Sequence, residues 1–191
     1  EKRKIIGPCS NGGGGLGFAS SHDDEAEAEE PVSQPSAGRN NIAVKTVEPQ
    51  KLYYAVYTMA PDEMNDKVVQ AAVKMGINIV KSGGKIAGPM PFIFDEIPAE
   101  NARELTFKLA FPVSGRPSSA GQYRLKRDKD FKCAYRLFEG KQEDMQGFSR
   151  QFFEEVIAAG YELSGEIRQV TDKDATLGQT TLKMELQIGI K

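Results

Sequence analysis

Residues that lie 77 positions apart match across much of the C-terminal part of the chain, and this repeat limits the folds available to it. Gly88 matches Gly165, and apolar residues between 105 and 113 match apolar residues between 182 and 190. The register holds over some 26 positions without a gap. Because a repeated supersecondary unit repeats its sequence at a fixed period, we expect the domain to contain two copies of one unit.

The first copy, residues 51–115, has the pattern strand, helix, strand, strand. Residues 52–59 are rich in Tyr and Val and favour a strand. Pro61 opens a helix, since proline suits the first helical position. The apolar residues of this helix recur at helical spacing and predict one buried stripe: Met64, Val68, Ala71, Ala72, Met75 and Ile79. Two further strands are predicted at 92–97 and 104–113.

The second copy, residues 130–191, repeats this order. A strand at 131–138 precedes a helix that ends before Gly160, and strands at 166–171 and 181–190 complete the unit. The apolar face of that helix is expected to contain Met145, Phe148, Phe152, Val156 and Ala159. The pattern predicts an α+β fold: a duplicated βαββ unit with pseudo-twofold symmetry, in which a six-stranded antiparallel sheet or barrel carries two helices around a cleft between the copies.

Residues 1–48 are expected to form a flexible linker or tail, and residues 49–191 the domain. A glycine run at 11–17 and six acids between 23 and 30 cannot pack a core. Because the sequence begins with Glu1, we expect a processed or trimmed form whose tail joins the domain to an upstream segment. Whether that segment is a membrane anchor, an export signal or another domain stays open. The domain is expected to be soluble, because no apolar run is long enough to span a bilayer, and its compartment also stays open.

Composition excludes several classes of chemistry from the domain. Residues 51–191 have a net charge near +1, which does not suit a protein that binds nucleic acid by itself. The only histidine is His22, so a Ser-His or Cys-His nucleophile pair within the domain is excluded. Cys9 and Cys133 are too few for a structural zinc site, and no cofactor is predicted. We expect Cys133 to be buried and inert, although a Cys9–Cys133 disulfide is conceivable in an exported protein.

The last predicted strand alternates between apolar residues and the polar residues Lys183, Glu185 and Gln187. Glu185 lies 77 positions after Lys108, so the two charges are expected at symmetric places around the cleft. A carboxylate among aromatic rings can recognise a lipophilic cation, or act as a general acid or base. A solvated strand face is the alternative. The predicted ligand-binding residues are Glu185, Lys108, Tyr54, Tyr57, Phe92, Phe94, Tyr135 and Tyr161.

Several segments resemble GyrI-like (gyrase-inhibitor-like) effector-binding domains over roughly residues 51–191. They are Met184-Glu185-Leu186-Gln187-Ile188-Gly189-Ile190, Ala87-Gly88-Pro89-Met90-Pro91-Phe92, Leu109-Ala110-Phe111-Pro112-Val113, Phe138-Glu139-Gly140 and Ala158-Ala159-Gly160-Tyr161-Glu162-Leu163-Ser164-Gly165. The resemblance implies a duplicated βαββ fold that holds lipophilic or cationic small molecules in a central cleft, either as a sensor in a transcription regulator or as a stand-alone protein. It also implies that Glu185 is the pocket glutamate.

The chain departs from the family pattern at two places. Lys141 and Gln142 follow Gly140 where relatives frequently have Pro-Tyr, and Lys108 occupies a position that often holds an acid. A Lys108–Glu185 ion pair would neutralise the site. We therefore expect neutral, zwitterionic or weakly polar aromatic ligands to bind better than dications.

A binding module without catalysis is the leading interpretation of these features. The alternatives are a hydrolase of strained or electrophilic small molecules, which would use Glu185 assisted by Tyr57 or Tyr135, and a haem or tetrapyrrole protein, since SOUL haem-binding proteins share this architecture. The absence of histidine between residues 51 and 191 disfavours haem. A partner protein that docks on the domain is a further alternative. Ligand identity and oligomeric state are not determined by the sequence.

Overall fold

The computed structural model describes residues 36–37, 42–99, 101–171 and 181–191. Predictions for residues 1–35 therefore lie outside the described residues. The described chain is an α+β fold with a mostly antiparallel sheet and two α-helices, as predicted. None of its helices is long and apolar enough to cross a membrane.

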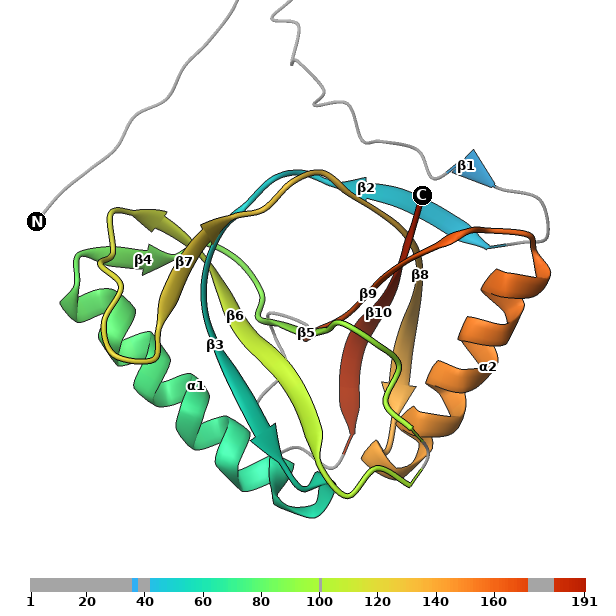
Figure 1. The fold of residues 1–191 in the computed structure, drawn as a ribbon, viewed down its shortest axis with the longest axis horizontal. Helices are drawn as coiled ribbons and strands as arrows, with labels where there is room; N and C mark the ends of the chain where they lie inside the picture. The colour runs from blue at the N-terminus through green and yellow to red at the C-terminus, as the bar shows by residue number, and fades with distance from the viewer. Residues whose placement is uncertain (1–35, 38–41, 100, 172–180) are drawn as a thin grey trace, which may run out of the picture. The chain divides into compact units, whose positions relative to one another are not determined.

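The sheet has the strand order β1-β2-β8-β10-β9-β5-β6-β3-β7, with β4 paired to β6 outside this path (Figure 1). Its strands are β1 (Ser36–Ala37), β2 (Ala43–Val47), β3 (Lys51–Met59), β4 (Gly84–Ile86), β5 (Pro91–Phe94), β6 (Leu105–Gly115), β7 (Arg124–Arg127), β8 (Phe131–Gly140), β9 (Leu163–Thr171) and β10 (Leu182–Ile190). The two halves of the sequence meet where β5 pairs with β9.

Helix α1 (Met64–Lys81) forms where the sequence predicts it. A 3-10 turn (Pro61–Glu63) precedes it, with Pro61 at its start and two acids that favour the positive end of the helix dipole. Its buried residues are Val68, Ala71, Ala72, Met75 and Ile79, so the predicted stripe is confirmed apart from Met64, which is partly buried. The helix ends at Ser82, and Gly83 then adopts a φ of 86° that favours glycine.

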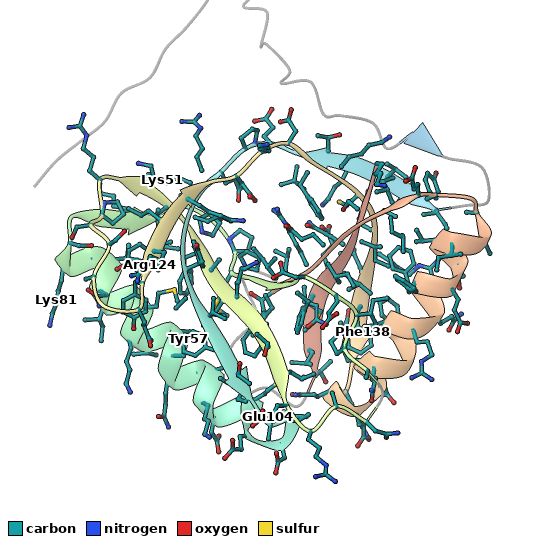
Figure 2. The ribbon with its side chains drawn as sticks, in the orientation of Figure 1. Lys51, Tyr57, Lys81, Glu104, Arg124 and Phe138 are labelled. Carbon is teal, nitrogen blue, oxygen red and sulfur yellow. The ribbon has the colours of Figure 1, made fainter. Side chains whose placement is uncertain are left out.

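Helix α2 (Met145–Ala158) follows a second 3-10 turn (Gln142–Asp144). Met145, Phe152 and Val156 are buried, while Phe148 and Ala159 are partly buried against the core. The ring of Phe138 on β8 packs against that of Phe148, with ring centres 4.9 Å apart. Figure 1 shows α1 beside β3 and β6 and α2 beside β8, and Figure 2 labels Tyr57 and Phe138 on these strands.

The described chain has ten strands where the sequence predicts six. Residues 43–47, which the sequence assigns to the tail, form β2 and pair with β8 along five residues. Residues 124–127 also form a strand, β7, that pairs with β3. The additional strands β1, β2, β4 and β7 are all short, which leaves little periodic pattern in the sequence to predict them. Duplication and a pseudo-twofold axis stay predictions.

Each strand presents one row of side chains to the helices and the opposite row to a second face. Residues 53, 55, 107 and 109 face α1, while residues 184 and 186 lie on the same face near α2. One row on the second face runs through directly paired residues: Lys108, Ile93, Arg168, Gln187 and Tyr135. Because side chains alternate along every strand, this register separates the helix-covered core from a second face that carries buried polar residues beside a small apolar cluster.

Gly189 marks a place where two segments approach closely. A Cβ atom added there would lie 2.8 Å from the Glu166 carbonyl oxygen and 2.8 Å from the ring of Phe131. We expect Gly189→Ala to lower the free energy of unfolding by about 1–3 kcal/mol, because the backbone oxygen cannot move aside. Gly147 is the control position. It is exposed in α2, and a Cβ atom added there would have no atom within 4 Å. Gly147→Ala should raise stability by about 0.5–1 kcal/mol in the same urea titration.

Cys133 is buried and free, as predicted, and is fully inaccessible to solvent on β8. Burial raises the pKa of its thiol to about 12. At pH 8 we expect iodoacetamide to leave Cys133 unmodified in the folded protein, since the thiolate is the reactive form and only about one molecule in 10⁴ would carry it. Peptide mass spectrometry measures the modification. Addition of 6 M guanidinium should restore rapid alkylation, and rapid alkylation without denaturant would contradict the assignment.

Candidate functional site

A pocket with a volume of about 610 Å³ lies on the second face, over strands β2, β8, β10, β9 and the start of β5. Its lining is mixed. The apolar side chains are those of aliphatic and proline residues together with Phe138 and Met184, and the charged ones come mainly from β8, β9 and β10. The lining includes Lys45, Val47, Pro91, Leu137, Glu139, Arg168, Val170, Lys183, Glu185 and Gln187.

Glu185 lies in this pocket and forms an ion pair with Lys45. The Lys45 ammonium is 2.5 Å from Glu185 Oε1, and it also sits 4.4 Å from the centre of the Tyr135 ring. The side chain of Glu185 is 19% exposed and that of Lys45 is 35% exposed. Lys45 is paired in the sheet with Cys133, two residues along β8 from Tyr135, so its side chain reaches over that ring to the carboxylate. The strand that sequence analysis places in the tail thus supplies a cation to the pocket.

Gln187 is the second group that holds Glu185. Its side-chain nitrogen donates a hydrogen bond of 2.6 Å to Glu185 Oε1, the same oxygen that Lys45 contacts. Gln187 is only 4% exposed, and its side-chain oxygen has no hydrogen-bond partner among the described residues. Leaving a buried carbonyl oxygen unpaired costs about 1–3 kcal/mol. The wall of the pocket therefore contains a buried acceptor without a partner among the described residues.

Arg168 forms a wall of the pocket and is almost fully buried. Its guanidinium donates hydrogen bonds of 2.6 Å to Asp128 and 2.6 Å to Glu166. It also stacks on Phe131, with Cζ 3.9 Å from the ring centre. A guanidinium that is satisfied by two carboxylates and a ring is fixed in place, because its planar donors match these partners together. Arg168 therefore contributes shape to the pocket more than free charge.

The remaining charged pair lies at the exposed rim. Lys183 on β10 is 3.0 Å from Glu139 on β8, and both side chains are more than half exposed. Each of the three basic residues that line the pocket, Lys45, Arg168 and Lys183, is thus paired with a carboxylate. The described residues contain no cluster of side chains that suits a metal ion.

Of the aromatic residues predicted to line the site, the structure brings only Tyr135 close to Glu185, through Lys45. Tyr57, Phe92 and Phe94 lie on the helix-facing side of the sheet, where their rings surround Phe107 with centres 5.6–6.3 Å apart. Burial raises the pKa of Tyr57 to about 12, with a further contribution from Tyr123. These rings build the core because they occupy the strand positions that alternate with the polar ones.

Tyr54, Tyr135, Tyr161 and Lys108 also lie outside the residues that line the pocket, although Lys45 contacts the Tyr135 ring. Tyr54 packs on a small cluster of Leu52, Ile93 and Ala110, and Tyr161 packs against the main core.

The Lys108–Glu185 pair that the sequence suggests is replaced by two separate pairs. The Lys108 ammonium contacts the two carboxylate oxygens of Asp95 at 2.6 and 2.8 Å, while Glu185 pairs with Lys45. Strands β5 and β9 lie between β6, which carries Lys108, and β10, which carries Glu185. Each of the two side chains therefore pairs with a residue that is nearer in space.

Sequence analysis misses Lys45, Arg168 and Gln187 as pocket residues. The signal for Lys45 is the run Ile42-Ala43-Val44-Lys45-Thr46-Val47, whose β-branched residues favour a strand. Gln187 lies on the same side of β10 as Glu185, so the alternation that selects Glu185 also selects Gln187. Arg168 gives no local signal, because its partner Asp128 is 40 residues away.

No protein-family model matches the chain, and no curated protein matches it. Solved structures do. EcmrR in its complex with DNA has a TM-score of 0.67 at 10% identity, over 78% of this chain and 57% of that one. The EcmrR C-terminal domain alone has a TM-score of 0.66 at 10% identity, over 78% of this chain and 96% of that one. The chain thus spans little more than half of EcmrR and nearly all of its C-terminal domain.

Two further solved structures share the fold. SAV2435 bound to tetraphenylphosphonium has a TM-score of 0.51 at 9% identity, over 78% of this chain and 93% of that one. A hydrolase from Listeria innocua has a TM-score of 0.54 at 10% identity, over 83% of this chain and 94% of that one. The structural neighbours include GyrI-like effector-binding domains, and at these identities the likeness is one of fold.

Proposed function

We propose that this chain is a small-molecule binding module of the GyrI-like kind, which takes an apolar or aromatic ligand in the pocket around Glu185. The observation that carries the proposal is the pocket itself: about 610 Å³, with apolar walls that include Val47, Pro91, Leu137 and Val170 and with the polar pair Glu185 and Gln187. A concave site of this size that combines apolar walls with placed polar groups is typical of a ligand site. In this proposal Pro91 supplies the wall from the first half, and the cleft lies between the two repeats.

The structural neighbours support this interpretation. SAV2435 is bound to tetraphenylphosphonium, a lipophilic cation, and EcmrR is in complex with DNA. The present chain corresponds to the C-terminal domain of EcmrR in fold. We infer that it senses or carries a small molecule, either by itself or joined to an upstream segment or partner protein, and that it does not bind nucleic acid directly.

A hydrolase is the second candidate, because one structural neighbour is a hydrolase and Glu185 is a partly buried carboxylate in the pocket. Glu185 Oε1 already accepts from Lys45 and Gln187, so Oε2 would have to accept the proton from water. With one oxygen engaged by two donors, binding without turnover stays the leading proposal.

We expect the wild-type protein and Glu185→Gln to hydrolyse styrene oxide at the same rate as a protein-free solution, as followed by chromatography of the diol. Turnover by the wild-type protein that is lost in Glu185→Gln, with binding of the substrate retained, would instead establish the hydrolase.

The binding proposal predicts the effect of filling the pocket. Val170→Trp places a large ring among the lining side chains and should weaken the binding of 4-hydroxybiphenyl and of Nile red at least about tenfold, because the ligand and the indole compete for one volume. Titration calorimetry and dye fluorescence measure the two affinities. Val56→Trp is the matched control, since Val56 is 55% exposed on β3 and lies outside the pocket lining.

Val56→Trp should leave both affinities within about twofold of the wild-type values. Circular dichroism checks that each variant is folded. Equal binding by the wild-type protein and Val170→Trp would place the ligand elsewhere, and the absence of binding to the wild-type protein would refute a pocket for neutral apolar molecules.

A further inference from the structure

The contact between Lys45 and Glu185 determines what kind of ligand the pocket can accept. The lysine comes from β2, 140 residues before its partner, and its ammonium occupies the space beside the carboxylate and above the Tyr135 ring. A carboxylate next to an aromatic ring is the arrangement that attracts an organic cation. Here the ammonium group of Lys45 occupies the place of such a cation.

A cationic ligand must therefore compete with an intramolecular cation. Because Lys45 is tethered through the pairing of β2 with β8, its effective concentration at Glu185 is in the millimolar range or higher. Displacing it would also separate a partly buried ion pair whose members are 35% and 19% exposed. A ligand without a positive charge meets neither penalty, since it can bind above the intact pair.

Gln187 adds a preference for hydrogen-bond donors. Its amide orientation is fixed by Glu185, because the opposite orientation would place two oxygen atoms 2.6 Å apart. The side-chain oxygen then remains buried and without a partner among the described residues. Because this oxygen is buried, neighbouring side chains must shift before a ligand O–H or N–H group can reach it. A ligand with such a group then satisfies the oxygen, and an aprotic ligand leaves the cost of an unpaired acceptor in place.

We propose that Lys45 is a built-in counter-ion that makes the pocket select uncharged, hydrogen-bond-donating aromatic molecules over lipophilic cations, with the Gln187 oxygen as the acceptor for the donor. This proposal rests on the proposed binding function and specifies its ligand class. It assigns the selectivity to Lys45 on β2, in place of the Lys108 partner that sequence alone suggests.

Three probes that share one apolar body test the selectivity by titration calorimetry. They are 4-hydroxybiphenyl, which has a donor; 4-methoxybiphenyl, in which the donor is capped; and biphenyl-4-yl-trimethylammonium, a permanent cation. For the wild-type protein we expect the hydroxyl probe to bind at least about fivefold more tightly than the methoxy probe, and the cation to bind most weakly.

The decisive variant is Lys45→Met, which removes the ammonium and keeps an unbranched apolar side chain. It should bind the trimethylammonium probe at least about tenfold more tightly than the wild-type protein does, and the hydroxyl probe within about threefold of the wild-type affinity. Lys183→Met is the matched control, because Lys183 lines the same pocket but pairs with Glu139. It makes the same change in net charge and should leave cation binding within about threefold. Lys45→Gln repeats the test should the methionine variant fold poorly.

Gln187→Met tests the acceptor and should abolish the preference for the hydroxyl probe over the methoxy probe. The proposal is overturned if the wild-type protein binds the cation as tightly as the hydroxyl probe. It is also overturned if Lys45→Met and Lys183→Met increase the affinity for the cation equally. If all three probes bind equally and Val170→Trp blocks them, the selectivity fails and the binding function stands. If no probe binds any variant, both fail.

Discussion

The pairing of β10 with β8 on one side and with β9 on the other is the constraint on which the site depends. A strand in the middle of a sheet has both backbone edges satisfied, so its register cannot slip without moving every side chain to the opposite face. That register sends Met184, Leu186 and Ile188 into the core. It leaves Glu185 and Gln187 side by side on the other face, where the hydrogen bond between them organises the pocket.

Charge in the pocket is balanced by partners that come from distant parts of the chain. Lys45 approaches from β2, Asp128 from the segment between β7 and β8, and Glu139 from the end of β8. Partly buried ions are tolerated when such partners and hydrogen bonds compensate for lost hydration. The pocket consequently has many charged residues and little unpaired charge. Under this condition, the shape of the pocket and single hydrogen bonds would determine which molecules fit it.

Sequence patterns predict the parts of this structure that local periodicity encodes. The apolar stripe of α1 and the alternation along β10 follow from spacing, because burial on one side imposes a period. The burial of Cys133 follows from the residue type, since free cysteine is among the most buried residues. The partner of Glu185 does not follow, since it depends on which strand pairs with β8 on the side away from β10. The aromatic residues expected in the cleft are a second example. Tyr57, Phe92 and Phe94 have side chains that would suit a pocket wall, but they lie at strand positions that face the helices and therefore pack in the core.

The position of Lys45 on β2 connects the pocket to the N-terminal part of the chain. β2 follows directly on the N-terminal segment and is held to the sheet through five residue pairs with β8. Mechanical force on that segment would pull β2 off the sheet, and a protease could remove residues up to 48. In both cases Lys45 would leave the pocket together with its strand. Glu185 would then keep only the hydrogen bond from Gln187 among the contacts described above, and the edge of β8 would be open to another chain. Loss of one short strand would thus change the electrostatics of the pocket and expose an unpaired sheet edge.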